Sequence, residues 1–416
     1  MCGRPVFTGP GKNLISRYAL FFNPMMNRIL TTVVLSVFIA LLGVGIIIPV
    51  LPVLATKLGA SGFWLGVITA SFSLSRGLFQ PVVGNLSDQW GRKGFLVVGL
   101  FIYGLVGLLI PHAGSVFHLV LIRIFQGVGS AMIVPVAMAY ASFLAPPGHE
   151  GRYMGVINIA IFCGIGAGPV IGGLFADAWG LASVFYMMAL LCFFAFVLVG
   201  FNLPACCPID RQQHTGLLAN VRLMLQRRRT VGILVARFAT MLMMVPTMAF
   251  LPVIMAQWPG NTGLQTGVVI ASRTLMNAVL QVPFGKLADR YDKVPLLVGG
   301  CVCMSVAVFL IPSMTTFPVM VAMYLFLGFG EAVLWPVLGA YAAEEGRTHF
   351  GHGTMMGVFN LAMSAGVFTG AMLAGSSVDF LGMRQAFWVT AIAILLLTLV
   401  AAVLIRAGEA AGETTG

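Results

Sequence analysis

Charged side chains are scarce in this 416-residue chain, where they make up 8% of the residues, with 12 acidic against 23 basic. Hydrophobic residues make up 59%. Soluble globular enzymes carry about a quarter charged residues, so this composition argues against one and is typical of a protein that crosses a membrane many times. The net charge of +11 does not indicate a nucleic-acid partner, because the basic residues fall mostly in short loops of one parity.

Motifs for nucleotide, metal and disulfide chemistry are missing too. No GxxxxGK[ST] segment is present, so ATP is not expected to drive the protein. His112 with His118, and His349 with His352, lie near predicted helix ends without a cysteine or carboxylate cluster, which predicts no metal site. The seven cysteines do not indicate a disulfide framework, and the role of Cys206–Cys207 stays open. With no catalytic triad or paired carboxylates, we predict no enzyme activity and no cofactor.

Apolar runs of about 20 residues, the length that crosses a bilayer core, recur along the chain and predict an all-α membrane protein with about 12 transmembrane helices. Loops of one parity carry residues such as Arg92, Lys93 and Lys286, whereas the opposite loops carry only Lys57 and Arg384. The positive-inside rule therefore puts both termini in the cytoplasm. The predicted helices are residues 29–55, 63–83, 94–112, 116–141, 153–176, 182–202, 231–256, 264–284, 294–312, 317–342, 354–376 and 385–406.

An internal repeat relates the first half of the chain to the second, with an offset of about 201 positions (328 − 127). The matching pairs are Gly127 with Gly328, Gly129 with Gly330, Pro135 with Pro336, Asp88 with Asp289, and Asp177 with Asp379. Two six-helix halves in the same orientation imply a pseudo-two-fold axis along the membrane normal and a central cavity between the halves. The expected domains are a tail (1–28), the first half (29–202), a cytoplasmic linker (203–230), the second half (231–406) and a tail (407–416).

A glycine-rich charged loop joins the second and third predicted helices. It contains Gly84, Asp88, Gly91, Arg92 and Lys93, and its glycines permit close approach and unusual backbone dihedral angles. Asp88 can cap a helix end or pair with Arg92. The repeat has a degenerate copy of this loop, which keeps an aspartate, at position 289, and has Asp292 where the second glycine is expected.

Three further motifs lie inside predicted helices. The first helix contains Pro49 and Pro52, which free backbone carbonyls and should bend its end. The fourth helix contains a motif that begins with Arg123 and Gln126. A buried arginine needs a partner or a water-filled cavity. The fifth has glycines spaced four apart, which form a smooth groove for a neighbouring helix. The residues of this fifth-helix motif are Gly155, Gly164, Gly168, Pro169 and Gly172.

Together these motifs resemble the major facilitator superfamily, in the twelve-span drug/proton antiporter branch that includes the tetracycline exporters. The resemblance covers about residues 28–406. It implies that Gly84, Asp88, Gly91, Arg92 and Lys93, together with Asp289 of the second copy, act as a conformational latch. It implies that Arg123 lines the cavity and takes part in proton coupling. It also implies that the glycine pattern of the fifth helix belongs to an antiporter that exports its substrate.

Charges inside the predicted helices point to the nature of the cargo. Glu331 is the only acid well within a predicted span, which makes it a candidate proton carrier, although simple pairing with an arginine stays possible. The first helix has no acid, which disfavours a conventional site for cationic drugs. Arg237, near a helix end, could instead extend to the membrane surface. The predicted cavity residues are Arg76, Arg123, Gln126, Arg237, Arg273 and Glu331, a net positive set that favours anions.

We therefore predict a proton-driven exporter of small amphipathic organic molecules, with an anionic metabolite such as a siderophore as one example. It works by alternating access, as a monomer, in a bacterial inner membrane. The alternatives are a polyspecific multidrug efflux pump or a metabolite importer, and, from a different class, a membrane sensor that does not transport. The expected partners are the substrate, protons and the lipid bilayer.

Overall fold

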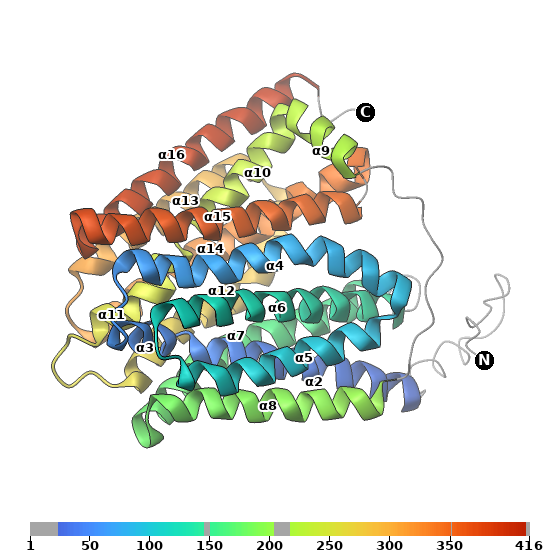
Figure 1. Ribbon diagram of the computed structural model, residues 1–416. Helices are drawn as coiled ribbons and strands as arrows, with labels where there is room; N and C mark the ends of the chain where they lie inside the picture. Colours follow the sequence, from blue (N-terminus) through green and yellow to red (C-terminus); the bar gives the residue numbers. More distant parts are fainter. Residues whose placement is uncertain (1–23, 145–149, 204–216, 351, 413–416) are drawn as a thin grey trace.

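The structure is a computed structural model that describes residues 24–144, 150–203, 217–350 and 352–412 (Figure 1). Every regular element in these ranges is a helix, which confirms the predicted all-α class. Eleven helical segments in the described part are long and apolar enough to cross a membrane. The 29-residue helix α4 (Gly62–Trp90) is also long enough, but serines and Arg76 make it more polar. It packs among the spanning helices as the twelfth member.

The first half contains seven α-helices, α2 to α8, two of which share one predicted span. They are α2 (Pro24–Ile47), α3 (Leu51–Lys57), α4, α5 (Arg92–Leu109), α6 (Val116–Leu144), α7 (Glu150–Trp179) and α8 (Leu181–Asn202), with the short 3-10 helix η1 (Ile110–His112) after α5. The expected bend in the first helix is a break between α2 and α3. Pro49 lies in this break and Pro52 in the first turn of α3, because proline has no N–H to donate to the preceding turn.

The second half repeats this order after one additional helix. It consists of α9 (Leu217–Gln226), α10 (Arg228–Met241), η2 (Pro246–Phe250), α11 (Leu251–Met255), α12 (Gly263–Arg290), α13 (Lys293–Leu310), η3 (Ile311–Ser313), α14 (Phe317–Glu345), η4 (Gly346–Phe350), α15 (His352–Leu381) and α16 (Met383–Ala410). The linker predicted over 203–230 is thus partly helical, since it contains α9.

Several helices continue beyond their predicted ends. α4 runs to Trp90 instead of residue 83, α14 to Glu345 instead of 342, and α16 to Ala410 instead of 406. The prediction followed apolar runs, which mark the hydrocarbon core, whereas backbone hydrogen bonding carries a helix on into the polar surface region. This difference matters for the acids near the helix ends, which are described below.

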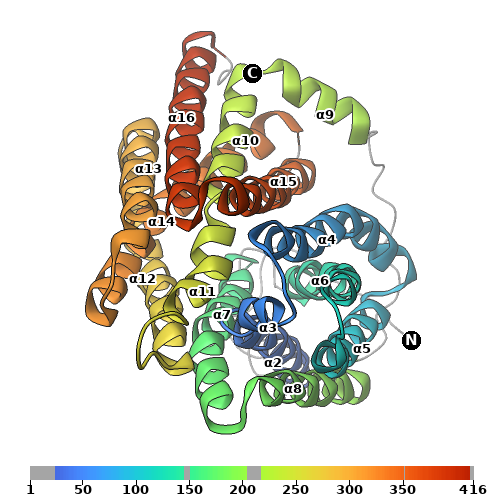
Figure 2. The same ribbon diagram turned by 60° about the vertical axis from the view of Figure 1, so that its left-hand side comes forward.

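The helices form one bundle whose two ends differ. We call the end where α4, α14 and α16 finish the basic end, because Arg92, Lys93 and Lys293 lie there. The other end, where η1 and η3 lie, is called the opposite end. Figure 2 shows the first half, blue to green, beside the second half, yellow to red.

Two seams of small residues join the halves, α4 against α15 and α7 against α12 (Figure 2). A Cβ atom added to Gly66 would lie 2.3 Å from the carbonyl oxygen of Ala371. One added to Gly173 would lie 2.0 Å from the carbonyl oxygen of Gly263. Real Cβ atoms do not come this close, so both seams require glycine.

The internal repeat has a direct counterpart in packing. A Cβ atom on Gly127 of α6 would lie 2.6 Å from the carbonyl oxygen of Phe72 in α4. One on Gly328 of α14 would lie 2.4 Å from the carbonyl oxygen of Arg273 in α12. Phe72 and Arg273 are themselves 201 positions apart. The two halves therefore share one backbone framework, held by glycines at related positions.

Candidate functional site

A buried ion pair lies inside the second half. The guanidinium group of Arg273, from α12, donates from Nε to Oε2 of Glu331 (2.7 Å) and from Nη2 to Oε1 (2.6 Å). Its Nη1 also donates to Oγ1 of Thr247, at 2.7 Å. Both charged side chains are buried, and the bidentate geometry is the strong form of an arginine–carboxylate contact. Glu331 is thus paired within its own half.

The first half carries a cation without such a partner. The guanidinium group of Arg123, in α6, lies 4.2 Å from the ring centroid of Phe72. It donates to the side-chain oxygen of Gln126 and, more weakly, to the carbonyl oxygen of Ile68. The side chain of Arg76, in α4, makes no salt bridge or hydrogen bond within the described residues. Neither arginine meets a described carboxylate, so the positive charge in this half is not neutralised locally.

Arg237 is buried and does not extend to the membrane surface, the alternative that the sequence left open. It is the tenth residue of α10, and 7% of it is exposed. Its Nη2 lies 3.0 Å from the sulfur of Met363. Its guanidinium carbon lies 5.2 Å from the ring centroid of Trp335 and 4.8 Å from that of Phe359. The interior therefore holds a third arginine that meets no described carboxylate.

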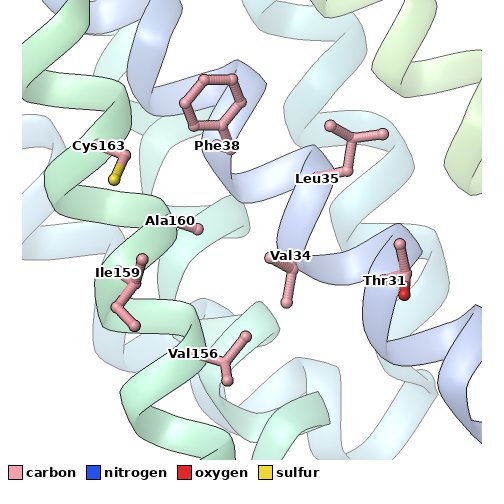
Figure 3. A pocket seen from close by; sticks show the side chains of 8 residues that line it. All are labelled: Thr31, Val34, Leu35, Phe38, Val156, Ile159, Ala160 and Cys163. Atoms are coloured by element: carbon pink, nitrogen blue, oxygen red, sulfur yellow. The ribbon is translucent and has the colours of Figure 1, made fainter.

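An apolar groove of about 330 Å³ lies between α2 and α7 (Figure 3). Its only polar side chains are the Thr31 hydroxyl and the Cys163 thiol. Phe162, beside Cys163 in α7, contacts the ring of Trp335 across the two halves, with ring centroids 6.4 Å apart. The groove therefore runs along the helix that also reaches the arginine-bearing interior. The groove lining consists of Thr31, Val34, Leu35, Phe38, Val156, Ile159, Ala160 and Cys163.

A second charged cluster, which the sequence analysis missed, lies at the basic end of the second half. Arg229 contacts Glu345 at 2.8 Å, Glu344 at 3.1 Å and Glu409 at 3.8 Å. Lys293 also contacts Glu344, at 2.9 Å. Both Arg229 and Glu345 are buried.

These carboxylates lie in the last turns of α14 and α16, beyond the spans predicted from the apolar runs, so they do not contradict the expectation that Glu331 is the acid well within a predicted span. Glu344 and Glu409 fall just beyond the apolar runs, in the polar last turns of their helices. The repeat could have pointed to the cluster, because Arg229 lies 201 positions after Arg28.

The latch residues of the glycine-rich loop are only partly described. Arg92 donates from Nη1 to the carbonyl oxygen of Ala139, at 2.6 Å. This hydrogen bond connects the start of α5 to the last part of α6. Gly91, at the junction of α4 and α5, has a φ of 96°, which favours glycine. The side chains of Asp88 and Asp289 lie outside the described residues. The predicted latch therefore stays a prediction.

The glycines of α7 pack against α2. A Cβ atom on Gly164 would lie 2.8 Å from the carbonyl oxygen of Phe38, and one on Gly172 would lie 2.3 Å from that of Ile46. Gly168 likewise faces the backbone of Gly45. Pro169 lies on the side that meets α12, where its carbonyl oxygen would be 2.1 Å from a Cβ atom on Gly267. Gly155 falls where side-chain surroundings are not described. The motif thus joins α7 to helices of both halves.

Comparison with known proteins identifies the family. A sequence model of the Major Facilitator Superfamily matches residues 33–222 and 232–415, almost the whole of both halves. The chain is a major facilitator superfamily transporter. An uncharacterized MFS-type transporter of Methanocaldococcus jannaschii is 31% identical over 86% of this chain and 93% of its own length. No group of three or more potential metal-binding side chains occurs in the described part of this transporter.

Two relatives with assigned roles are drug-resistance proteins. Multidrug resistance protein 2 of Bacillus subtilis is 25% identical over 83% of the chain and 87% of its own length. The quinolone resistance protein NorA of Staphylococcus aureus is 30% identical, over 36% of the chain and 39% of its own length. The fold also matches a crystal structure of a bacterial homolog of the lysosomal transporter Spinster, with a TM-score of 0.79 at 13% identity, covering 92% of this chain and 98% of that one.

Proposed function

We propose that this transporter is a proton-coupled exporter of amphipathic organic anions, a siderophore-like metabolite being one example. The observation that carries the proposal is charge. Arg237 is buried, and Arg76 and Arg123 are half-buried, and none of the three forms a salt bridge with a described carboxylate, whereas Arg273 is neutralised by Glu331. A cation removed from water needs an anionic or strongly polar partner, so this interior suits a cargo with a carboxylate.

The apolar groove suits the rest of an amphipathic cargo. Its walls are aliphatic and aromatic, and its volume of about 330 Å³ is within the range of small-molecule sites. Phe162 of α7, the helix that lines one side of the groove, contacts Trp335 of the arginine cluster, so the apolar groove and the arginines are reached along the same helix.

Export fits both the family motif of α7 and elementary electrostatics. With the basic end in the cytoplasm of a bacterial inner membrane, an inside-negative potential favours outward movement of an anion by about 2.3 kcal/mol per charge per 100 mV. Glu331 is our candidate for the proton site. A protonated carboxyl group holds Arg273 more weakly, so proton uptake there changes the electrostatics of the cavity. Arg123 is the candidate coupling residue or substrate anchor.

The test is proton movement in inverted membrane vesicles with an acidic interior. Anionic siderophore-like compounds and cationic dyes are added in turn, and collapse of the pH gradient is followed for wild type, Glu331→Gln and the control Glu409→Gln. Glu409 is a salt-bridged acid of the same half but lies at the basic end. Collapse with anions alone, lost in Glu331→Gln and kept in Glu409→Gln, supports the proposal. If proton movement in Glu331→Gln is the same as in wild type, Glu331 is not the proton site.

A polyspecific multidrug pump is the second candidate, and the roles of the bacterial relatives favour it. Collapse of the gradient with cationic dyes, and none with anions, would select it over the anion exporter. Uptake seen only in right-side-out vesicles would select an importer.

A further inference from the structure

Arg237 and Trp335 form a largely buried cluster of hydrogen-bond donors inside the second half. Arg237 comes from α10, Trp335 from α14, and the ring of Phe359 from α15 lies against the same guanidinium group. The nearest acceptor to Arg237 is the sulfur of Met363, which is a weak one. Two aromatic faces and a thioether thus surround a cation that is 7% exposed.

Two buried donors in this cluster have no hydrogen-bond partner, Nε of Arg237 and Nε1 of Trp335. Buried N–H groups are normally paired, because an unpaired one forfeits the hydrogen bond that it made to water. Both are donors and neither can accept, so the ligand that satisfies them must supply acceptors. The guanidinium group lies over the indole ring, and each of the two donors suits an oxygen atom of a carboxylate.

The neighbouring arginines are less available to such a ligand. Arg273 already holds Glu331 with two hydrogen bonds, and Arg123 donates to Gln126. Among Arg123, Arg237 and Arg273, Arg237 therefore has the least local compensation by hydrogen-bond acceptors.

The walls indicate what the carboxylate is attached to. The ring of Trp335 faces Phe162 of the other half, with centroids 6.4 Å apart, and Phe359 lies on the same guanidinium group. Flat aromatic walls favour a flat aromatic ligand through offset or edge-to-face stacking. We propose that Arg237 and Trp335 bind the carboxylate of an aromatic acid, with its ring against Trp335, Phe162 and Phe359. This inference rests on the proposed transport of anions and names their class.

The site also spans the two halves, because Phe162 belongs to α7 and Trp335 to α14. A ligand held there touches both bodies that move against each other during transport. Binding at Arg237 is thereby linked to the seam that must rearrange.

Binding to the full-length protein in lipid nanodiscs tests the inference, with naphthoate as the probe and naphthamide and cyclohexanecarboxylate as comparisons. Arg237→Gln removes the charge, and Trp335→Phe keeps a ring but removes the N–H. The chain offers a matched control pair, because Arg384 lies 5.6 Å from the ring of Trp388 at the opposite end of the same half. Arg384→Gln and Trp388→Phe change the same residue types away from the site.

We expect naphthoate to bind wild type at least tenfold more tightly than either comparison compound. Arg237→Gln should weaken naphthoate binding about 10- to 100-fold and Trp335→Phe about 3- to 10-fold, because they remove a charged and a neutral donor. Both control variants should bind as wild type does. Melting temperatures check that each variant is folded. If Arg237→Gln is unstable, the naphthoate affinity of Trp335→Phe, which preserves the packing, tests the site.

Three results would overturn the inference. They are equal binding of naphthoate and naphthamide, equal binding of naphthoate and cyclohexanecarboxylate, and unchanged naphthoate affinity in both site variants. If anions still drive proton movement in vesicles, any of these results overturns the aromatic-acid site but not the proposed transport of anions. If only cationic dyes collapse the pH gradient and naphthoate does not bind, the aromatic-acid site and the proposed function are both wrong.

A separate observation concerns the opposite end of the bundle. Asp177, at the end of α7, accepts hydrogen bonds from the backbone N–H groups of Gly263 (2.7 Å) and Leu264 (2.8 Å), which begin α12. Asp379, near the end of α15, accepts from Gly62 and Phe63 at the start of α4, both at 2.8 Å. Each aspartate thus caps the first helical turn of a helix from the other half.

The two contacts are related by the internal repeat, since Asp177 and Asp379 lie 202 positions apart and Gly62 and Gly263 lie 201 apart. They close the same end of both seams. We infer that these aspartates are positioning residues that hold the halves together at this end and release together when it opens. The alternative is a pair of independent local caps.

Amide hydrogen exchange separates joint release from independent caps. Asp177→Ala removes one contact, and exchange is measured at the amides of Gly62 and Phe63, which Asp177 does not touch. Joint release predicts about fivefold or greater acceleration there, the usual scale of coupling between distant sites. Ser183→Ala, which removes a local bond at the same end, should leave these amides unchanged. Acceleration confined to residues 263–266 would overturn the inference.

Discussion

The two halves share a framework and differ in charge. In the first half Arg123 of α6 lies on the ring of Phe72 and meets no described carboxylate. In the second half Arg273 of α12 holds Glu331, and Tyr324 donates to the carbonyl oxygen of Thr247. The repeat relates Phe72 to Arg273, Arg123 to Tyr324, and Ser130 to Glu331. The arginine and the aromatic ring thus occupy each other's helices in the two halves, and of the related positions 130 and 331 only 331 carries an acid.

The comparison distinguishes residues that both halves need for packing from residues that can differ between them. The glycines at 127 and 328 let helices approach at related points, so they are kept. The side chains beside them face the interior, where charge decides what binds, and there the halves have diverged. In the second half Glu331 neutralises Arg273, whereas Arg123 of the first half and Arg237 of the second meet no described carboxylate.

The largest expected effect comes from breaking the buried pair. Glu331→Ala leaves Arg273 buried without its carboxylate and should lower the free energy of unfolding by about 3–5 kcal/mol. Arg123→Ala, in the first half, removes a ring contact, one hydrogen bond to Gln126 and a weak one to Ile68, and should cost about 1 kcal/mol. Unfolding in detergent titrations measures both. Replacing both Arg273 and Glu331 by Met should restore most of the lost stability. Equal losses in Glu331→Ala and Arg123→Ala would contradict the difference between the two halves.

A second comparison concerns the basic ends. Arg229 is buried and contacts three carboxylates, whereas its counterpart Arg28 is exposed and donates to Asn202. Arg229→Ala uncovers the charge of buried Glu345 and should lower the free energy of unfolding by about 3 kcal/mol. Arg28→Ala should change it by less than about 0.5 kcal/mol. The same unfolding titration applies, and a large effect of Arg28→Ala would contradict the assignment.

The shared framework predicts equal effects instead of different ones. Gly127→Ala and Gly328→Ala each place a methyl group against a backbone carbonyl of the neighbouring helix. Each should lower the free energy of unfolding by about 1–3 kcal/mol, since overpacking forces the helices apart. Gly299→Ala, where a Cβ atom meets nothing within 4 Å, is the control. A tolerated substitution at one site alone would show that the halves also differ in packing.

The smallest expected effect comes from making the first half resemble the second. Gln126→Glu gives Arg123 an acid at a position that it already contacts. Neutralising this arginine should weaken binding of an anionic probe about tenfold, roughly 1.4 kcal/mol, and should leave an uncharged analogue unaffected. Equilibrium binding in nanodiscs measures it. Unchanged anion affinity would remove Arg123 from the cargo site.

Much of this architecture could be predicted because a bilayer admits few solutions. Apolar runs of spanning length have to be helices, so the all-α class and the repeat of two halves follow from composition and spacing. The motif glycines also predicted close helix contacts, such as those of Gly164 and Gly172 with α2. The ends of α14 and α16 were missed, because hydropathy stops at the polar surface while the helix does not.

The sequence by itself therefore determined the helical class, the twofold repeat, the family and the excess of interior arginines. The tertiary structure alone decided which of those arginines is neutralised. Arg273 and Glu331 lie 58 positions apart, on different helices, and only the crossing of α12 with α14 brings them into contact. Arg237 depends equally on three helices for its surroundings. Charge pairing is set by distance in space, which residue spacing along separate helices does not fix.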